Sequence, residues 1–231
     1  RQNSEFVSNS EVSPRYFARL NSMSNGATSI LLDTNILLSK TLRDWILLPN
    51  QILNKKYFDI HTTQNILDEW GYHWLRENPT GNDAARVKVR EQIGKSVFVL
   101  EGYPISSIQG YPDKNDLHIH AAMMEHNIDY LVTNDKALLD YWETSENTDE
   151  PLPYVTISTD DLLMDFVEPH LGRSTQESLT LSSTDLAEIY LFQERYFIKK
   201  YGEADLCGAL ERAEAPRFAA YLRRHMLPRL P

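Results

Sequence analysis

Short apolar runs alternate with amphipathic stretches along most of the chain, a pattern typical of α/β proteins. Helical periodicity is expected over 41–54 with a break at Pro49, over 63–77, 83–95 and 136–143, from 116 onward, and from 160 to 167. Because strands that alternate with helices usually run parallel, the pattern predicts a three-layer α/β/α domain around a central parallel five-stranded sheet. The expected strands are Ser29–Leu32, Tyr57–His61, Val97–Leu100, Ile128–Val132 and Tyr154–Ile157.

Both ends of the chain differ from this pattern. Residues 1–27 are polar, rich in Ser and Asn, and lack sustained periodicity, so we expect a flexible arm or an added segment there. Residues 28–170 contain the strand–helix units. Residues 171–231 show helical periodicity without strands, which predicts a helical C-terminal extension.

Acidic residues stand at the ends of the predicted elements. Asp33 and Asp135 each follow a strand, Asp116 opens a helix, and Glu69 lies in the helix after the second strand. Each Asp taken alone fits a helix N-cap. However, the carboxyl ends of parallel strands share one edge of the sheet, so the four carboxylates could converge there. Their repulsion would then favour a bound cation, and oxygen ligands suit Mg²⁺ or Mn²⁺.

The sequence around these acids forms four motifs. They read LLDTNILL at 31–38, ILDEW at 66–70, NDLHIHAA at 115–122 and VTND at 132–135. In content, order and spacing these motifs resemble those of the PIN-domain nucleases, and most closely the VapC-type toxins. The similarity covers roughly Ser29 to Asp135.

This resemblance implies a divalent-metal-dependent endoribonuclease whose substrate is RNA and whose partner is a small cognate antitoxin. Asp33, Glu69, Asp116 and Asp135 would be the catalytic metal ligands, direct or through water. Asn35 and Thr133 are expected to support them by hydrogen bonds. A PIN fold that only binds RNA or protein stays open as an alternative, whereas an aspartyl-phosphate phosphotransferase would need a second Asp at the position of Asn35.

Composition and net charge further narrow the class of protein. Hydrophobic residues at 42% and charged residues at 24% are ordinary for a globular protein, and the single Cys207 excludes an internal disulfide. With no apolar run of roughly 18 residues and no signal-peptide core, we expect no membrane association and a cytoplasmic location. The net charge of −10 argues against a broad basic RNA-coating face, but not against a nuclease whose divalent ions offset its acidic pocket.

Two further segments suggest partner surfaces. Residues 215–231 carry four Arg and no acid, so Arg217, Arg223 and Arg224 are the predicted RNA contacts, with a solvated helix face as the alternative. Residues 41–54 hold more large apolar side chains than one core face needs. That surplus indicates either a docking surface for an antitoxin or burial under the C-terminal tail. A homodimer is also open.

Overall fold

The chain folds around a parallel five-stranded sheet. The computed structural model describes residues 28–53, 56–106, 108, 110–146, 148, 151–167 and 180–230. The predicted arm at 1–27 and the predicted boundary near residue 170 lie outside these described residues. The predicted α/β class and parallel sheet are confirmed, with strand order β3-β2-β1-β4-β5. The strands are β1 Thr28–Leu32, β2 Phe58–Thr63, β3 Phe98–Leu100, β4 Tyr130–Val132 and β5 Val155–Ile157.

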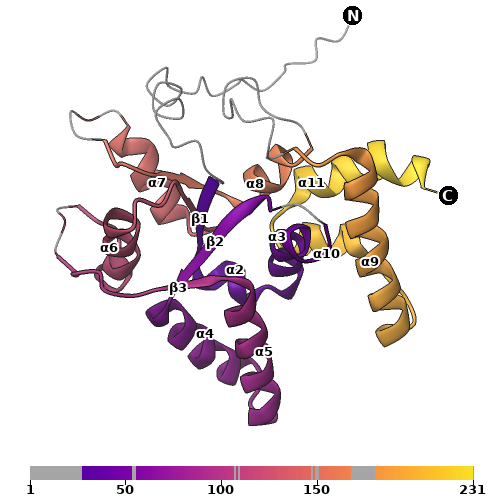
Figure 1. Cartoon of the computed structure of the whole chain (residues 1–231), viewed down its shortest axis with the longest axis horizontal. Coiled ribbons are helices and arrows are strands. Elements are labelled where there is room, and N and C mark those ends of the chain that lie inside the picture. The colour runs from indigo at the N-terminus through magenta and orange to yellow at the C-terminus, as the bar shows by residue number, and fades with distance from the viewer. Residues whose placement is uncertain are drawn as a thin grey trace, which may run out of the picture.

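Helices cover both faces of this sheet (Figure 1). The chain moves outward from β1 to β2 and β3, then crosses back to β4 and moves outward again to β5. Because parallel crossovers are right-handed, these two directions place their helices on opposite faces. One group is α2 Thr34–Leu38, α3 Lys40–Ile52, α4 Gln64–Glu77 and α5 Asp83–Ser96; the other is α6 Leu117–Glu125 and α7 Lys136–Ser145.

The reversal of direction creates a topological switch point between β1 and β4. These two strands pair in parallel, with Leu32 opposite Val132. The connections that follow them leave in opposite directions, so a crevice forms at their carboxyl ends, where open α/β sheets bind ligands. The apolar runs of both strands are buried, as expected for a central strand covered on both faces.

Helix α3 continues through Pro49, so the break predicted there is wrong. Pro49 removes one backbone donor, but the surrounding turns pack their apolar side chains into the core, and packing supplies most helical stability in proteins. Trp45, Leu47 and Leu48 are all buried. Burial therefore accounts for the apolar surplus of this segment, and the interpretation as an open partner surface is wrong for these side chains.

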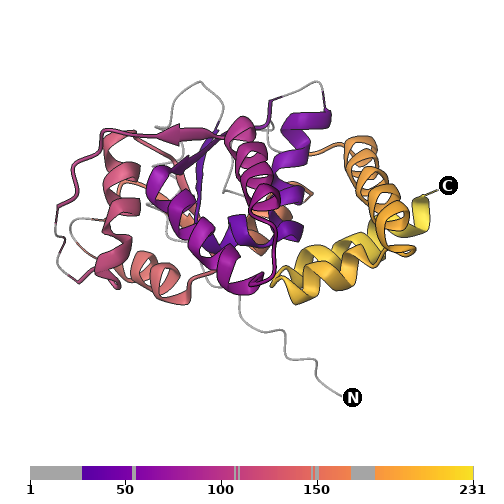
Figure 2. The ribbon, with the colours of Figure 1, turned by 90° about the horizontal axis from the view of Figure 1, so that it is seen from below.

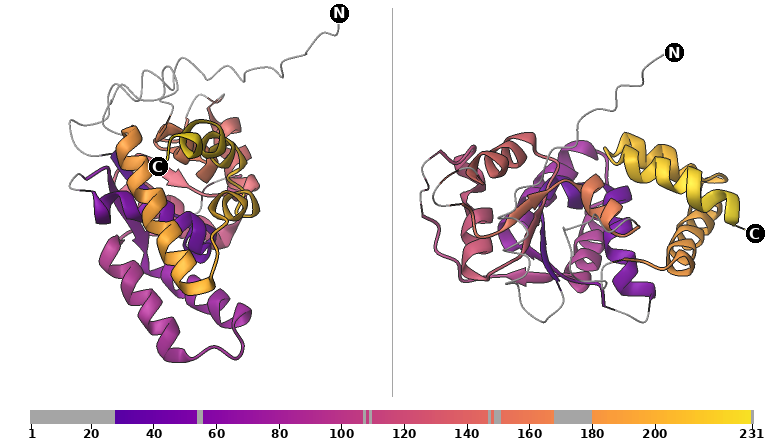
Figure 3. Two further views of the ribbon diagram at one scale, coloured as in Figure 1. Left: turned by 90° about the vertical axis from the view of Figure 1, so that its right-hand side faces the viewer. Right: turned by 90° about the horizontal axis from the view of Figure 1, so that it is seen from above.

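Helices from the C-terminal part of the chain provide that cover (Figures 2 and 3). The ring of Phe218 meets the ring of Trp45 edge-on at a centroid distance of 5.0 Å, and α3 also packs against the following helices. These are α8 Thr159–Asp165, α9 Ser183–Tyr201, α10 Leu206–Arg212 and α11 Pro216–Tyr221, which short turns at Leu222–Met226 and Leu227–Arg229 follow. Within the described residues, no helix is both long and apolar enough to cross a membrane.

Candidate active site

Asp33 occupies the switch point. It follows β1 directly, and its side chain is only 7% exposed. One carboxylate oxygen, Oδ1, accepts a hydrogen bond of 2.6 Å from the backbone N–H of Thr34 and so caps α2. The other, Oδ2, accepts from the Thr133 hydroxyl at 2.6 Å and from the Asn35 amide at 2.7 Å. Asp33 is therefore both an N-cap and the centre of a side-chain network.

This network joins the loops that follow β1 and β4. The Asn35 amide also lies 3.0 Å from the Thr133 hydroxyl, and its carbonyl oxygen accepts from the Asn134 N–H at 3.2 Å. The Thr133 oxygen in turn accepts from the N–H of Asp135 at 3.0 Å. The structure thus places Asn35 and Thr133 in contact with Asp33, as their predicted supporting roles require.

Glu69 reaches the same edge from α4. Its Oε2 accepts a hydrogen bond of 2.6 Å from the Thr34 hydroxyl, and its Oε1 lies 3.5 Å from His73 Nε2. Thr34 directly follows Asp33, so its backbone and side chain link the two carboxylates. Sequence reasoning missed Thr34, because a separation of 35 positions from Glu69 hides the contact.

Asp116 ends the 3₁₀ turn Lys114–Asp116 at the start of α6. Among the described residues its carboxylate makes no capping hydrogen bond, whereas Asp113 caps the turn by accepting from the Asn115 N–H at 2.8 Å. Burial is the main cause that raises the pKa of Asp116 from 3.8 to about 7, and the nearby charges of the other acids add to it. Helix capping therefore does not explain this carboxylate.

Asp135 has a more ordinary environment. It is exposed, and its Oδ1 accepts from the N–H groups of Ala137 at 2.7 Å and Leu138 at 3.4 Å, so it caps α7. Its charge still raises the pKa of Asp33 and of Asp116. For Asp33, burial is the largest cause of a raised pKa, and the hydrogen bonds from Thr133 and Thr34 oppose it.

The charges of the four predicted acids therefore influence one another, but the carboxylates do not converge on a common point. In the part of the chain that the structure describes, no three His, Cys, Asp or Glu side chains are arranged as a group that could hold a metal ion. The donor chemistry nevertheless fits a hard divalent cation, since the available atoms are oxygens. Burial is the main cause that raises the pKa of Asp33 and of Asp116, and the charges of the other acids add to both shifts.

Tyr111 is a second residue that sequence reasoning missed. It is buried, and its ring lies 5.3 Å from that of Tyr141 and 5.7 Å from that of His120. Burial raises the pKa of its hydroxyl, and the charges of Asp116 and Asp33 contribute to the same shift. Tyr111 thus lies beneath the acidic edge, in a loop whose composition gave no signal of it.

Two of the predicted RNA contacts have internal partners instead. Arg217 pairs with the buried Asp160 at 3.0 Å and with Asp161 at 2.6 Å, and so joins the C-terminal helices to α8. Arg223 forms an ion pair with Glu211. Carboxylates of the chain itself bind the guanidinium of Arg217, which is 50% exposed, and its contact with RNA stays a prediction. Arg224 is exposed.

A groove of about 460 Å³ opens directly beside the network. It runs between the start of α3 and the end of α10, and it carries Arg212 on its wall. Arg212 makes a long ion pair of 3.5 Å with Asp205. The other lining residues are Asn35, Ser39, Thr41, Leu42, Asn134, Ala209, Ala213 and Glu214.

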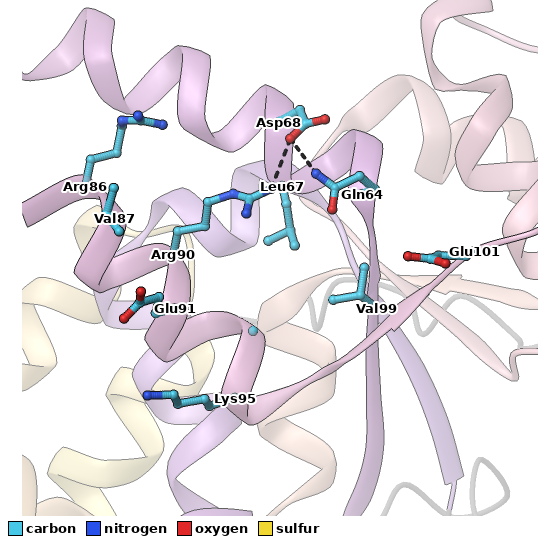
Figure 4. Close-up of a pocket in the computed structure, with 11 residues that line it drawn as sticks. Gln64, Leu67, Asp68, Arg86, Val87, Arg90, Glu91, Lys95, Val99 and Glu101 are labelled. Atoms are coloured by element: carbon cyan, nitrogen blue, oxygen red, sulfur yellow. Dashed lines mark hydrogen bonds and ion pairs between the residues drawn. The ribbon is translucent and has the colours of Figure 1, made fainter. Parts of the chain in front are cut away.

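A cavity of about 730 Å³ lies elsewhere, between α4, α5 and β3 (Figure 4). Asp68 bonds Gln64 at 2.6 Å and Arg90 at 3.1 Å across its rim, and none of the four predicted acids lines it. Asp68 and Glu69 are neighbours in sequence, yet they belong to different sites.

Comparison with known proteins assigns no family to the chain. No protein-family model matches the chain, and no curated protein matches it either. Five chains of solved structures match. One is the crystal structure of PAE2754 from Pyrobaculum aerophilum, at a TM-score of 0.41 and 19% identity, with 61% of this chain and 96% of that chain covered.

Proposed function

We propose that this protein is a divalent-metal-dependent endoribonuclease of the PIN-domain type, which hydrolyses RNA phosphodiester bonds with Mg²⁺ or Mn²⁺ at the acidic edge. The observation that carries the proposal is the position of Asp33, which is buried at the topological switch point and held there by Thr133 and Asn35. Asp116 supports it, because its carboxylate has no capping role and a pKa near 7.

In this proposal each side chain has a defined task. When bound, the divalent cation would activate water and neutralise charge on the phosphate oxygens. Asp33, Glu69, Asp116 and Asp135 hold it directly or through water, and Thr133 and Asn35 fix the rotamer of Asp33. Near neutral pH, Asp116 would release its proton as the cation binds, so metal affinity should rise with pH.

The motif resemblance extends the proposal to a toxin–antitoxin pair with a small cognate antitoxin. A PIN fold that binds RNA or protein without cutting is the second candidate. Two observations favour it: Asp33 and Glu69 receive short hydrogen bonds from within the chain, and no group of three ligands is assembled among the described residues.

Cleavage of a labelled RNA in Mn²⁺ or in EDTA separates these candidates. Wild type should cut only with the metal, and Asp33→Asn should not cut, because it replaces a charged ligand by a neutral amide of the same shape. Asp68→Asn is the matched control, since Asp68 faces the other cavity. Both variants should melt cooperatively.

Two results would contradict the proposal. Asp33→Asn protein that cuts at the wild-type rate would show that the site is misassigned. Wild-type protein that binds RNA but never cuts it would establish the binding module. For the toxin role, expression of wild type should slow growth of the host, and expression of Asp33→Asn should not.

A further inference from the structure

The C-terminal half of α9 exposes aromatic and basic side chains together. Residues 195–201 read RYFIKKY, with three basic residues and no acid, in a chain of net charge −10. Tyr196 and Tyr201 are 41% and 57% exposed. Lysines at the end of a helix also complement its dipole, but the dipole does not account for exposed rings beside them.

Cations sit on the faces of these rings. Lys200 Nζ lies 5.6 Å from the ring centroid of Tyr196 and 4.9 Å from that of Tyr201. From the start of α3, Lys40 Nζ lies 4.8 Å from the Tyr196 centroid. We call Lys40, Tyr196, Lys200 and Tyr201 the aromatic–basic face. Exposed rings beside basic side chains are the elements from which proteins build single-strand nucleic-acid sites.

This face adjoins, through Lys40, the groove beside the candidate active site. Lys40 lies between Ser39 and Thr41, which line the groove beside α10. The same groove begins at Asn35 and Asn134 of the Asp33 network and carries Arg212 on its wall. Packing of α9 and α10 against α3 holds the three parts together (Figure 2).

We infer that the aromatic–basic face is a stacking platform for a single-stranded segment of RNA, which reaches the acidic edge along the groove between α3 and α10. The inference rests on the proposed function for the identity of its ligand. Unpaired bases stack on Tyr196 and Tyr201, and Lys200 neutralises phosphates on the way. Lys40 and Arg212 contribute by exchanging their carboxylate partners, Asp44 and Asp205, for phosphates. A duplex offers no unpaired bases and binds less tightly.

Fluorescence anisotropy with a labelled oligouridine in EDTA tests this without cleavage. The double variant Tyr196→Ala/Tyr201→Ala should weaken binding about tenfold or more, the loss expected when bases lose their stacking partners. Tyr196→Phe/Tyr201→Phe should bind as wild type, because stacking needs only the ring. Phe98→Ala is the matched control, an exposed ring on β3 with Lys56 at 5.4 Å.

Salt dependence provides an independent readout. Lys200→Ala should lower the slope of log affinity against log salt by about 0.7 for the phosphate contact that it loses. A matched RNA duplex should bind more weakly than the single strand and should not respond to the tyrosine changes.

The outcomes separate the inference from the proposed function. Binding that depends on the two tyrosines, in a protein that never cuts RNA, supports the platform and refutes the nuclease. Cleavage of RNA by a protein whose RNA affinity is unchanged by the tyrosine substitutions supports the nuclease and refutes the platform. If sedimentation shows a dimer that Tyr196→Ala/Tyr201→Ala dissociates, and RNA affinity is unchanged, the face is an interface between copies and the inference is wrong.

Discussion

Replacement of Asp116 by Asn should stabilise the metal-free protein at neutral and higher pH. Burial, and after it the charges of Asp33, Asp113 and Glu69, raise the pKa of Asp116 to about 7 from an ordinary value of 3.8. The folded protein therefore binds this proton more tightly than the unfolded chain does. Stability must then fall as the pH rises from about 4 to about 7, and remain low above it.

The size of the effect follows from the pKa. A rise from 3.8 to about 7 corresponds to about 4 kcal/mol at 1.36 kcal/mol for each pH unit. Asp116 is partly open to solvent, which screens the charges of the neighbouring acids. We therefore halve this free energy to about 2 kcal/mol. For a chain of this size that free energy corresponds to a rise of about 4–8 °C in melting temperature.

Thermal melts in EDTA, followed by circular dichroism at about pH 5 and about pH 8, measure the difference. Asp116→Asn should melt above wild type at the higher pH, and the gap should shrink at the lower pH. Addition of Mn²⁺ should raise the free energy of unfolding of wild type by about 2.7 kcal/mol at a hundredfold excess over Kd, and should raise that of the variant less. An Asp116→Asn protein that is less stable than wild type in EDTA at the higher pH would refute the reasoning.

Two further changes test the network and a strained turn. Thr133→Val should lower the free energy of unfolding, measured in urea, by about 1.5–3 kcal/mol, because it removes a hydrogen bond from the buried Asp33 carboxylate. An unchanged urea midpoint would contradict this role of the Thr133 hydroxyl. Glu214 has a positive φ of 64° after α10, so Glu214→Gly should raise the melting temperature by about 2–4 °C through relief of about 1 kcal/mol. Asn127→Gly is its control, since Asn tolerates its φ of 51°, and an equal gain in both variants would argue against strain at Glu214.

Local sequence was sufficient to predict the sheet and the position of Asp33. Period-two and buried apolar runs mark strands, and a carboxylate directly after a strand marks the ligand-binding edge. Thr63 opens the helix predicted over 63–77 and caps α4, since its hydroxyl accepts from the Ile66 N–H at 3.1 Å. Each of these depends on neighbours in the sequence.

The remaining features depend on contacts between distant residues. The apolar surplus around Trp45 indicates that something covers it but not that Phe218 does, and nothing near Arg217 indicates that Asp160 binds it. Asp116 looks like an N-cap in sequence, yet the neighbouring Asp113 does the capping. Single-sequence reasoning places charges along the chain, but which charges neutralise one another is decided by tertiary packing.

The pairing of β1 with β4 has a consequence for the order of assembly. Asp33 and Thr133 are 100 residues apart, and so are Ser29 and Asp129, which bond at the opposite ends of the same two strands. Closure of so long a loop is slow compared with formation of the helices between them. A nascent or proteolysed chain that ends before Val132 would carry Asp33, Glu69 and Asp116 but not the contact of Asp33 with Thr133, so the activity proposed for this edge would require that β4 has docked.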